Sequence, residues 1–72
     1  MDNFSERLKY LRLNKNLTQK QLAIESNLTE RGIQRYESGE RTPTLSAAIL
    51  LADALDISLD YLVGRSDDPT RH

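Results

Sequence analysis

The sequence contains no cysteine, and its one histidine, His72, is the last residue. Disulfides and thiolate metal sites are therefore excluded, which suits a reducing, cytoplasmic setting. No apolar run approaches the roughly 18 residues that a membrane-spanning helix needs, and residues 1–4 lack the charged and apolar regions of a signal peptide. With 72 residues, the chain suits one small domain with a thin core.

Neither sign of charge dominates, because 10 basic residues face 11 acidic ones and the formal net charge is −1. Residues 1–20 nevertheless carry +3, from Arg7, Lys9, Arg12, Lys15 and Lys20 against Asp2 and Glu6. Residues 45–72 carry −3, from Asp53, Asp56, Asp60, Asp67 and Asp68 against Arg65 and Arg71. This division is compatible with ordinary solvated charge or with one basic, nucleic-acid-facing pole and one acidic pole.

Capping residues and apolar periodicity predict five helices and no strand, so the fold class is all-α. The expected helices span residues 4–15, 19–26, 30–38, 45–55 and 59–63. Suitable N-caps precede four of them, at Asn3, Thr18, Thr29 and Ser58. Residues that tolerate a left-handed backbone follow four of them, at Asn16, Asn27, Gly39 and Gly64.

Apolar side chains form an inward stripe on the first and fourth predicted helices. The stripe of the first contains Phe4, Leu8 and Leu11, and that of the fourth contains Leu45, Ala48, Ala52 and Leu55. Five other apolar residues are expected to face outward: Leu13, Ile24, Ala47, Leu50 and Ala54. Ala47, Leu50 and Ala54 are three and four residues apart, which is compatible with chance exposure or with a self-association surface.

Residues 18–37 are typical of a helix-turn-helix, in which two short helices flank a tight connection at Asn27 and Leu28. Ala23 is small where the helices approach, while Leu22, Leu28 and Ile33 are expected to share a core. On the predicted helix 30–38, Ile33 and Tyr36 mark the inner side. Arg31, Gln34, Arg35 and Ser38 therefore face outward, and Glu30 lies on the flank. Arg, Gln and Glu can read guanine, adenine and cytosine edges, although this face alone is also compatible with a solvated surface.

From Phe4 to Gly64 the sequence resembles the Cro/CI repressor family, also called the XRE family. The resemblance is carried by Phe4-x3-Leu8-x2-Leu11-Arg12, Leu17-Thr18-Gln19-x2-Leu22-Ala23, Leu28-Thr29, Ile33-x2-Tyr36-Glu37-x-Gly39-x-Arg41-x-Pro43, Leu51-Ala52-x2-Leu55 and Ser58-Leu59-Asp60-Tyr61-Leu62. No one segment is specific, but their order and spacing together are. The resemblance implies a compact five-helix, lambda-repressor-like bundle with a helix-turn-helix formed by helices 2 and 3.

The resemblance also implies roles for individual residues. Gln19 matches a position that contacts the DNA backbone, and Arg41 matches one near the sugar-phosphate chain. Thr29, Glu30, Arg31, Gln34 and Arg35 match recognition-helix positions that face DNA. The chain departs from the family at Asn16 and Asn27, where glycine is usual, and at Gly32, where serine or threonine is usual. Gly32 is for that reason not included among the expected contacts.

These observations predict that residues 1–64 form a helix-turn-helix domain and that residues 65–72 form a flexible tail or linker. The expected function is a cytoplasmic, bacterial or phage-derived transcriptional regulator, a repressor, that reads operator half-sites with helix 3 in the major groove. Expected partners are double-stranded operator DNA and a second copy of the chain on that DNA. No catalytic constellation, cofactor, metal, membrane contact or small-molecule substrate is evident. The alternative is a protein-interaction module, such as an antitoxin or a partner-controlled regulator.

Two further expectations concern pairing within and between chains. Arg12 and Glu37 lie beside the apolar sides of helices 1 and 3, so both charges are expected to be partly buried and paired with each other, as the family match supports. For dimerisation, the acidic C-terminal third is the candidate surface, with the Ala47–Leu50–Ala54 stripe and nearby Tyr61. Asp53, Asp56 and Asp60 there are expected to weaken the free dimer by mutual repulsion.

Overall fold

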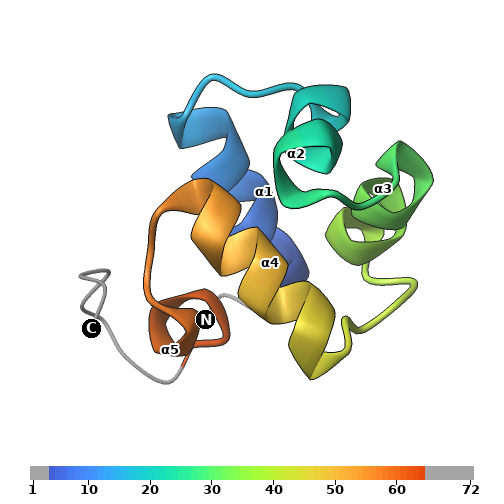
Figure 1. Ribbon diagram of the computed structural model, residues 1–72. Coiled ribbons are helices and arrows are strands. Elements are labelled where there is room, and N and C mark those ends of the chain that lie inside the picture. The colour runs from blue at the N-terminus through green and yellow to red at the C-terminus, as the bar shows by residue number, and fades with distance from the viewer. Residues whose placement is uncertain (1–3, 65–72) are drawn as a thin grey trace.

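The computed structural model describes residues 4–64, and these form five α-helices (Figure 1). The helices are α1 (Phe4–Asn14), α2 (Gln19–Ser26), α3 (Glu30–Ser38), α4 (Leu45–Leu55) and α5 (Leu59–Leu62). The all-α prediction is confirmed, and within the described range no residue is in a strand. Two predicted ends were one residue too long, because α1 ends at Asn14 and α5 at Leu62. The expected Asn3 cap and the predicted tail at 65–72 lie outside the described residues.

Local side-chain hydrogen bonds explain where the helices begin. Thr18 and Gln21 form a reciprocal capping box, in which each backbone N–H donates to the other side chain. At the next three starts, Thr29, Thr44 and Ser58 each accept a backbone N–H from three residues ahead. These bonds satisfy N–H groups that have no partner inside a helix, which is why short helices are stable at these positions.

Left-handed residues follow the ends of all five helices. Asn16 and Gly64, predicted as terminators after α1 and α5, have φ values of 57° and 84°. Asn27 and Gly39 adopt φ values of 60° and 81° after α2 and α3, as the sequence indicated. Asp56 has a φ of 57° after α4, an end for which no terminator was predicted. Aspartate is among the few non-glycine residues that adopt this region readily, so the α4 terminator was recognisable in principle.

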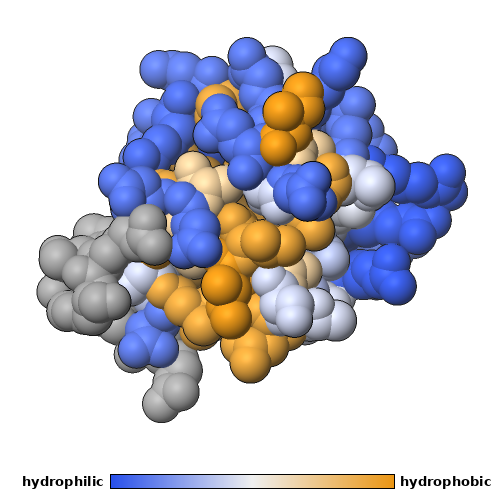
Figure 2. All heavy atoms as spheres, viewed as in Figure 1, coloured by the Kyte–Doolittle hydropathy of each residue, from blue (hydrophilic) through white to orange (hydrophobic). Residues whose placement is uncertain are grey.

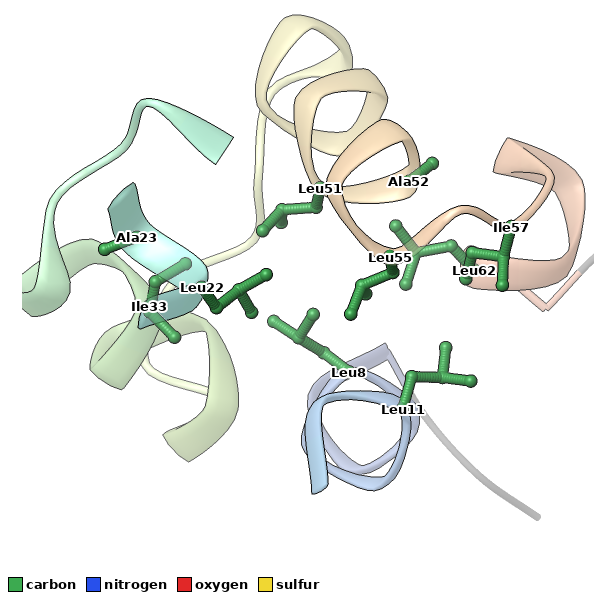
Figure 3. Packing of buried hydrophobic residues seen from close by; sticks show 10 residues of the cluster. All are labelled: Leu8, Leu11, Leu22, Ala23, Ile33, Leu51, Ala52, Leu55, Ile57 and Leu62. Carbon is green, nitrogen blue, oxygen red and sulfur yellow. The ribbon is translucent and has the colours of Figure 1, made fainter. Parts of the chain in front are cut away.

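The core lies where α1, α2, α3 and α4 converge, and α5 closes it from below α4 in the view of Figure 1. Figure 3 shows Leu8, Leu22 and Leu55 pointing toward one another from three different helices. Six large side chains are fully buried: Leu8, Leu22, Ile33, Leu51, Leu55 and Leu62. Burial of each side chain contributes about 1.5–3 kcal/mol to the stability of the fold. Because Ile33 of α3 is one of the six, this packing holds α3 in place without a disulfide.

Helix α4 differs from its predicted pattern at three positions. Leu45, expected to face inward, is 68% exposed, whereas Ala47, expected to face outward, is only 6% exposed. Ala54, also expected to face outward, is half-buried and packs against the core. Leu45 is the first residue of α4, and because helical side chains tilt toward the N-terminus it extends beyond the covered turns. The buried side of α4 is wide, with Ala47, Ala48, Leu51, Ala52 and Leu55 all covered. No helix of residues 4–64 is long and apolar enough to cross a membrane.

Candidate nucleic-acid interface

The inner side of α3 is held against the core. Ile33 is fully buried, and half-buried Tyr36 meets Phe4 of α1 edge-to-face, with ring centroids 6.4 Å apart. Helix α3 also packs against both α1 and α2. The opposite side is consequently turned away from the domain, and Figure 2 shows hydrophilic side chains over α3. The orientation of α3 is therefore fixed by its packing against the core.

The outward side of α3 brings together three of the residues selected from the sequence. Arg31, Gln34 and Arg35 line one shallow hollow, together with Ser38 and Glu40. Arg31 and Gln34 are exposed, and 34% of the Arg35 side chain is exposed. Glu30 is also exposed, in the first turn of the same helix. The polar groups of these side chains are therefore accessible to a ligand as large as a DNA duplex, and binding would require no rearrangement of the core.

The chain turns back immediately after α3. Gly39 adopts its positive φ, and the carbonyl oxygen of Arg35 then accepts the backbone N–H groups of Glu40 at 3.0 Å and Arg41 at 3.2 Å. This return places Glu40 Oε2 3.7 Å from Arg35 Nε. Gly39 was predictable from the sequence as a stop, whereas Glu40 was not among the predicted residues, although a left-handed stop brings the following residues back over the last turn.

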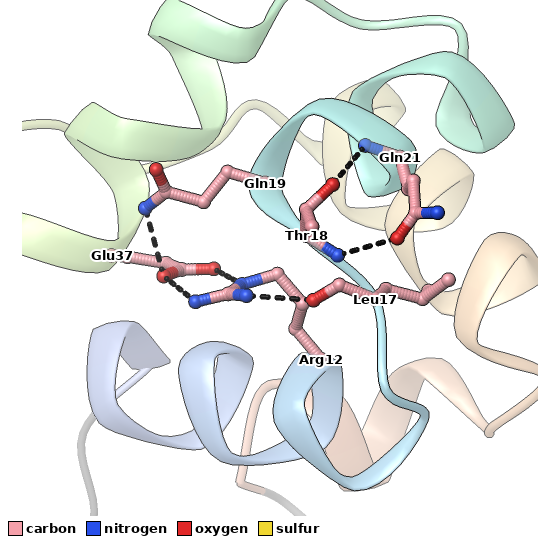
Figure 4. A network of polar contacts seen from close by, with 6 residues as sticks. All are labelled: Arg12, Leu17, Thr18, Gln19, Gln21 and Glu37. Carbon is pink, nitrogen blue, oxygen red and sulfur yellow. Dashed lines mark hydrogen bonds and ion pairs between the residues drawn. The ribbon is translucent and has the colours of Figure 1, made fainter.

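A buried polar network joins α1, α2 and α3 (Figure 4). Arg12 donates from Nε to Glu37 Oε2 at 2.6 Å and from Nη2 to Glu37 Oε1 at 3.0 Å, so the expected pair is present and bidentate. Arg12 Nη1 donates to the carbonyl oxygen of Leu17 at 2.7 Å. Only 9% of the Arg12 side chain and 4% of the Glu37 side chain are exposed. The network thus connects α1, the turn after it, and α3.

Gln19 belongs to the same network, which the sequence did not predict. Its Nε2 donates to Glu37 Oε1 at 3.2 Å. Because an ionised carboxylate only accepts, the amide nitrogen must face Glu37, and the side chain is held at the first turn of α2. Gln19 is half-buried there, so it remains accessible from solvent while its orientation is restricted.

The remaining two selected residues, Thr29 and Arg41, do not line the outward hollow. Thr29 is exposed and caps α3, accepting the Gly32 N–H at 3.0 Å. Arg41 is exposed and lines a neighbouring hollow with Phe4 and Tyr36. A side chain at Gly32 would place its Cβ 3.0 Å from Thr29 Oγ1, so glycine relieves crowding at this cap. Within residues 4–64 no acidic or histidine group is arranged to hold a metal ion.

A family model described as helix-turn-helix matches residues 8–62. The transcriptional repressor RstR of the cryptic phage CTXphi of Vibrio cholerae is 45% identical over 60 residues, which is 83% of this chain and 54% of that protein. The regulator YqaE of Bacillus subtilis is 41% identical over 66 residues, 90% of this chain and 57% of that protein. The chain thus spans little more than half the length of these relatives.

Solved structures share the arrangement of the helices. The restriction-modification controller protein C.AhdI of Aeromonas hydrophila is 39% identical, with a TM-score of 0.80 over 82% of this chain and 89% of that chain. The P22 c2 repressor, solved in complex with a synthetic operator, is 24% identical, with a TM-score of 0.85 over 92% of this chain and all of that chain. The second likeness concerns the fold alone, and it agrees with the predicted lambda-repressor-like bundle.

Proposed function

The chain belongs to the helix-turn-helix family, in its XRE type, and on this basis we propose that it is a sequence-specific transcriptional regulator. It acts as a repressor by occupying operator DNA, with residues 1–64 as the DNA-binding domain. One observation carries the proposal: Arg31, Gln34 and Arg35 share one outward hollow on a helix whose opposite side is anchored in the core. A rigidly held helix can present these groups to base edges at little entropic cost.

The chemistry of these side chains defines what α3 reads. In the major groove, arginine donates two hydrogen bonds to the O6 and N7 atoms of guanine, and glutamine pairs with the N6 and N7 atoms of adenine. Glu30 can accept from the amino group of cytosine. Each good bidentate contact contributes about 1–3 kcal/mol of discrimination. The half-site is therefore expected to contain guanine opposite Arg31 and Arg35.

Contacts to the sugar-phosphate backbone fix the register of α3. Gln19 and Thr29 lie at the N-terminal ends of α2 and α3, where the helix dipole and unpaired N–H groups favour an anion. Because Glu37 takes one amide hydrogen of Gln19, the second hydrogen on Nε2 remains to donate to a phosphate. Arg41 supplies a further cation from the loop after α3. Such contacts position the protein and carry no direct sequence information.

Two copies of the chain are proposed to bind adjacent half-sites about 34–36 Å apart, because one recognition helix reads too few base pairs to select an operator. Figure 2 shows an apolar surface over α4, beside the hydrophilic surface of α3. Its exposed members are Leu45, Ile49 and Leu50. Leu50 belongs to the stripe predicted from the sequence, but the other two members of that stripe are covered, Ala47 fully and Ala54 partly. Operator DNA of a bacterium or phage would place this activity in the cytoplasm.

A selection experiment tests the proposed function. Wild-type protein would select duplexes from a random pool, and gel shifts would compare the selected duplex with a scrambled one at two salt concentrations. We expect a palindromic preference of at least ~10³-fold, with affinity falling as salt rises. Failure to prefer any duplex would contradict the proposal and favour a protein-interaction module.

A second measurement tests the dimer. Sedimentation of the protein with the selected palindromic duplex is expected to give two chains per duplex, and mostly monomers without DNA. One chain per duplex at saturation would contradict the dimer. Leu50→Glu is expected to lower the stoichiometry or the cooperativity; if it changes neither, the dimer stands but the α4 surface does not.

A further inference from the structure

Glu40 contributes a carboxylate to the hollow that α3 turns outward, among two arginines and a glutamine. Resting on the proposed function, we propose that Glu40 is a specificity-determining residue. It lies beside the Nε edge of Arg35 and repels phosphate, so it weakens binding to DNA that lacks the correct base. It leaves the terminal edge of the Arg35 guanidinium free to read guanine.

The fold itself holds Glu40 at this position. Its backbone N–H donates to the carbonyl oxygen of Arg35 at 3.0 Å and to Ser38 Oγ at 3.3 Å. Ser38 Oγ in turn donates to the same Arg35 carbonyl at 3.1 Å. The two bonds from the Glu40 N–H form because Gly39 reverses the chain with a φ of 81°. The carboxylate is thus attached to a backbone that is fixed relative to Arg35.

The geometry of the pair allows Arg35 to act while Glu40 remains beside it. The distance of 3.7 Å joins Glu40 Oε2 to Arg35 Nε, and it is too long for a hydrogen bond. Bidentate reading of guanine needs two N–H groups in a fixed fork, and the two terminal nitrogens of the guanidinium supply them. Because 34% of the Arg35 side chain and 68% of the Glu40 side chain are exposed, water screens the pair and it exchanges easily.

The effect of Glu40 differs between DNA sequences. On non-operator DNA, attraction to phosphates supplies essentially all of the binding. A carboxylate beside Arg35 compensates part of that arginine's charge and is itself repelled by phosphates. On the operator, the short directional bonds from Arg35 to guanine persist in the presence of Glu40. The carboxylate therefore lowers non-operator affinity more than operator affinity and raises the ratio between them.

Glu40→Gln tests this inference with nearly the same side-chain shape. Binding to the selected palindromic duplex and to its scrambled counterpart would be measured over a salt series. We expect the scrambled duplex to bind about three- to ten-fold more tightly, the Coulomb effect of one charge near phosphates in water, and the selected duplex to change by less than about two-fold. The salt slope on scrambled DNA should steepen by about 0.9, as for one additional phosphate contact.

Two controls isolate the proposed route. Glu25→Gln changes an exposed glutamate of α2 that does not line the hollow, and it should leave the ratio unaltered. In an Arg35→Ala background, Glu40→Gln should no longer change the ratio between the two duplexes. Equal tightening on both duplexes, no change on either, or a persistent ratio change without Arg35 would overturn the inference. If the wild-type protein itself fails to distinguish the duplexes, it is the proposed function that fails.

Discussion

Within residues 4–64, two arginine–carboxylate pairs involve α3, and they differ in distance and in exposure. Arg12 and Glu37 are nearly enclosed, with a shortest N–O distance of 2.6 Å and side-chain exposures of 9% and 4%. Arg35 and Glu40 are 3.7 Å apart, with exposures of 34% and 68%. If one partner of the buried pair is removed, the other remains as an uncompensated charge with little access to water. If one partner of the exposed pair is removed, water hydrates the remaining charge. The buried pair therefore stabilises the fold, whereas the exposed pair can exchange partners.

The largest expected effect is on stability and comes from breaking the buried pair. Glu37→Ala should lower the free energy of unfolding by about 3–5 kcal/mol, because Arg12 loses its bidentate acceptor in a site with little access to water. Urea unfolding monitored by circular dichroism measures the change. Arg12→Met together with Glu37→Leu should recover much of the loss, since apolar residues of similar volume can replace a buried pair. A loss below about 1 kcal/mol for Glu37→Ala alone would contradict the stabilising role of the Arg12–Glu37 pair.

The next effect is on binding and comes from the exposed side of α3. Arg35→Ala should cost about 1–3 kcal/mol on the selected duplex and relax the preference at one base position, because a bidentate contact to guanine is lost. Arg31→Ala should behave similarly at a different position. Gel shifts on single-base variants of the duplex measure both changes. If either variant keeps the base preference unaltered, that arginine does not read a base.

Gln19 lies between the two regions, because it is tied to Glu37 and reaches solvent. Gln19→Ala should weaken binding by about 1 kcal/mol, as for one net hydrogen bond, and equally on selected and scrambled duplexes. The salt dependence should stay nearly the same, since a neutral amide releases no counterion. Unfolding should change little because Arg12 still bonds both Glu37 oxygens. A change confined to the selected duplex would instead indicate that Gln19 contributes to base reading.

The smallest expected effect is the stability change from breaking the exposed pair. Glu40→Gln should alter the free energy of unfolding by less than about 0.5 kcal/mol, because exposed ion pairs are screened and cost side-chain entropy. The same urea titration, run beside Glu37→Ala, compares the two pairs directly. A cost near that of Glu37→Ala would remove the distinction between them and would mean that Glu40 supports the fold.

Much of the candidate site was predictable because its residues follow one helix period. Once Ile33 and Tyr36 were placed inward, the outward position of Arg31, Gln34 and Arg35 followed from 100° per residue. The pair of Arg12 and Glu37 was predictable because each charge borders an apolar stripe and the family resemblance supports the pairing. The α4 surface was less predictable, since Leu45 and Ala47 depend on which turns the other helices cover.

The sequence by itself determined the helices and their ends, because caps and terminators such as Thr18, Thr29 and Gly39 act within one turn of the chain. The tertiary structure alone decided that Gln19 bonds Glu37 across two helices and that Leu45 is exposed while Ala47 is buried. These outcomes depend on the angles between packed helices and on which turns the neighbouring helices cover. Both are products of how the whole core closes, whereas a helix period or a cap is decided by a few neighbouring residues.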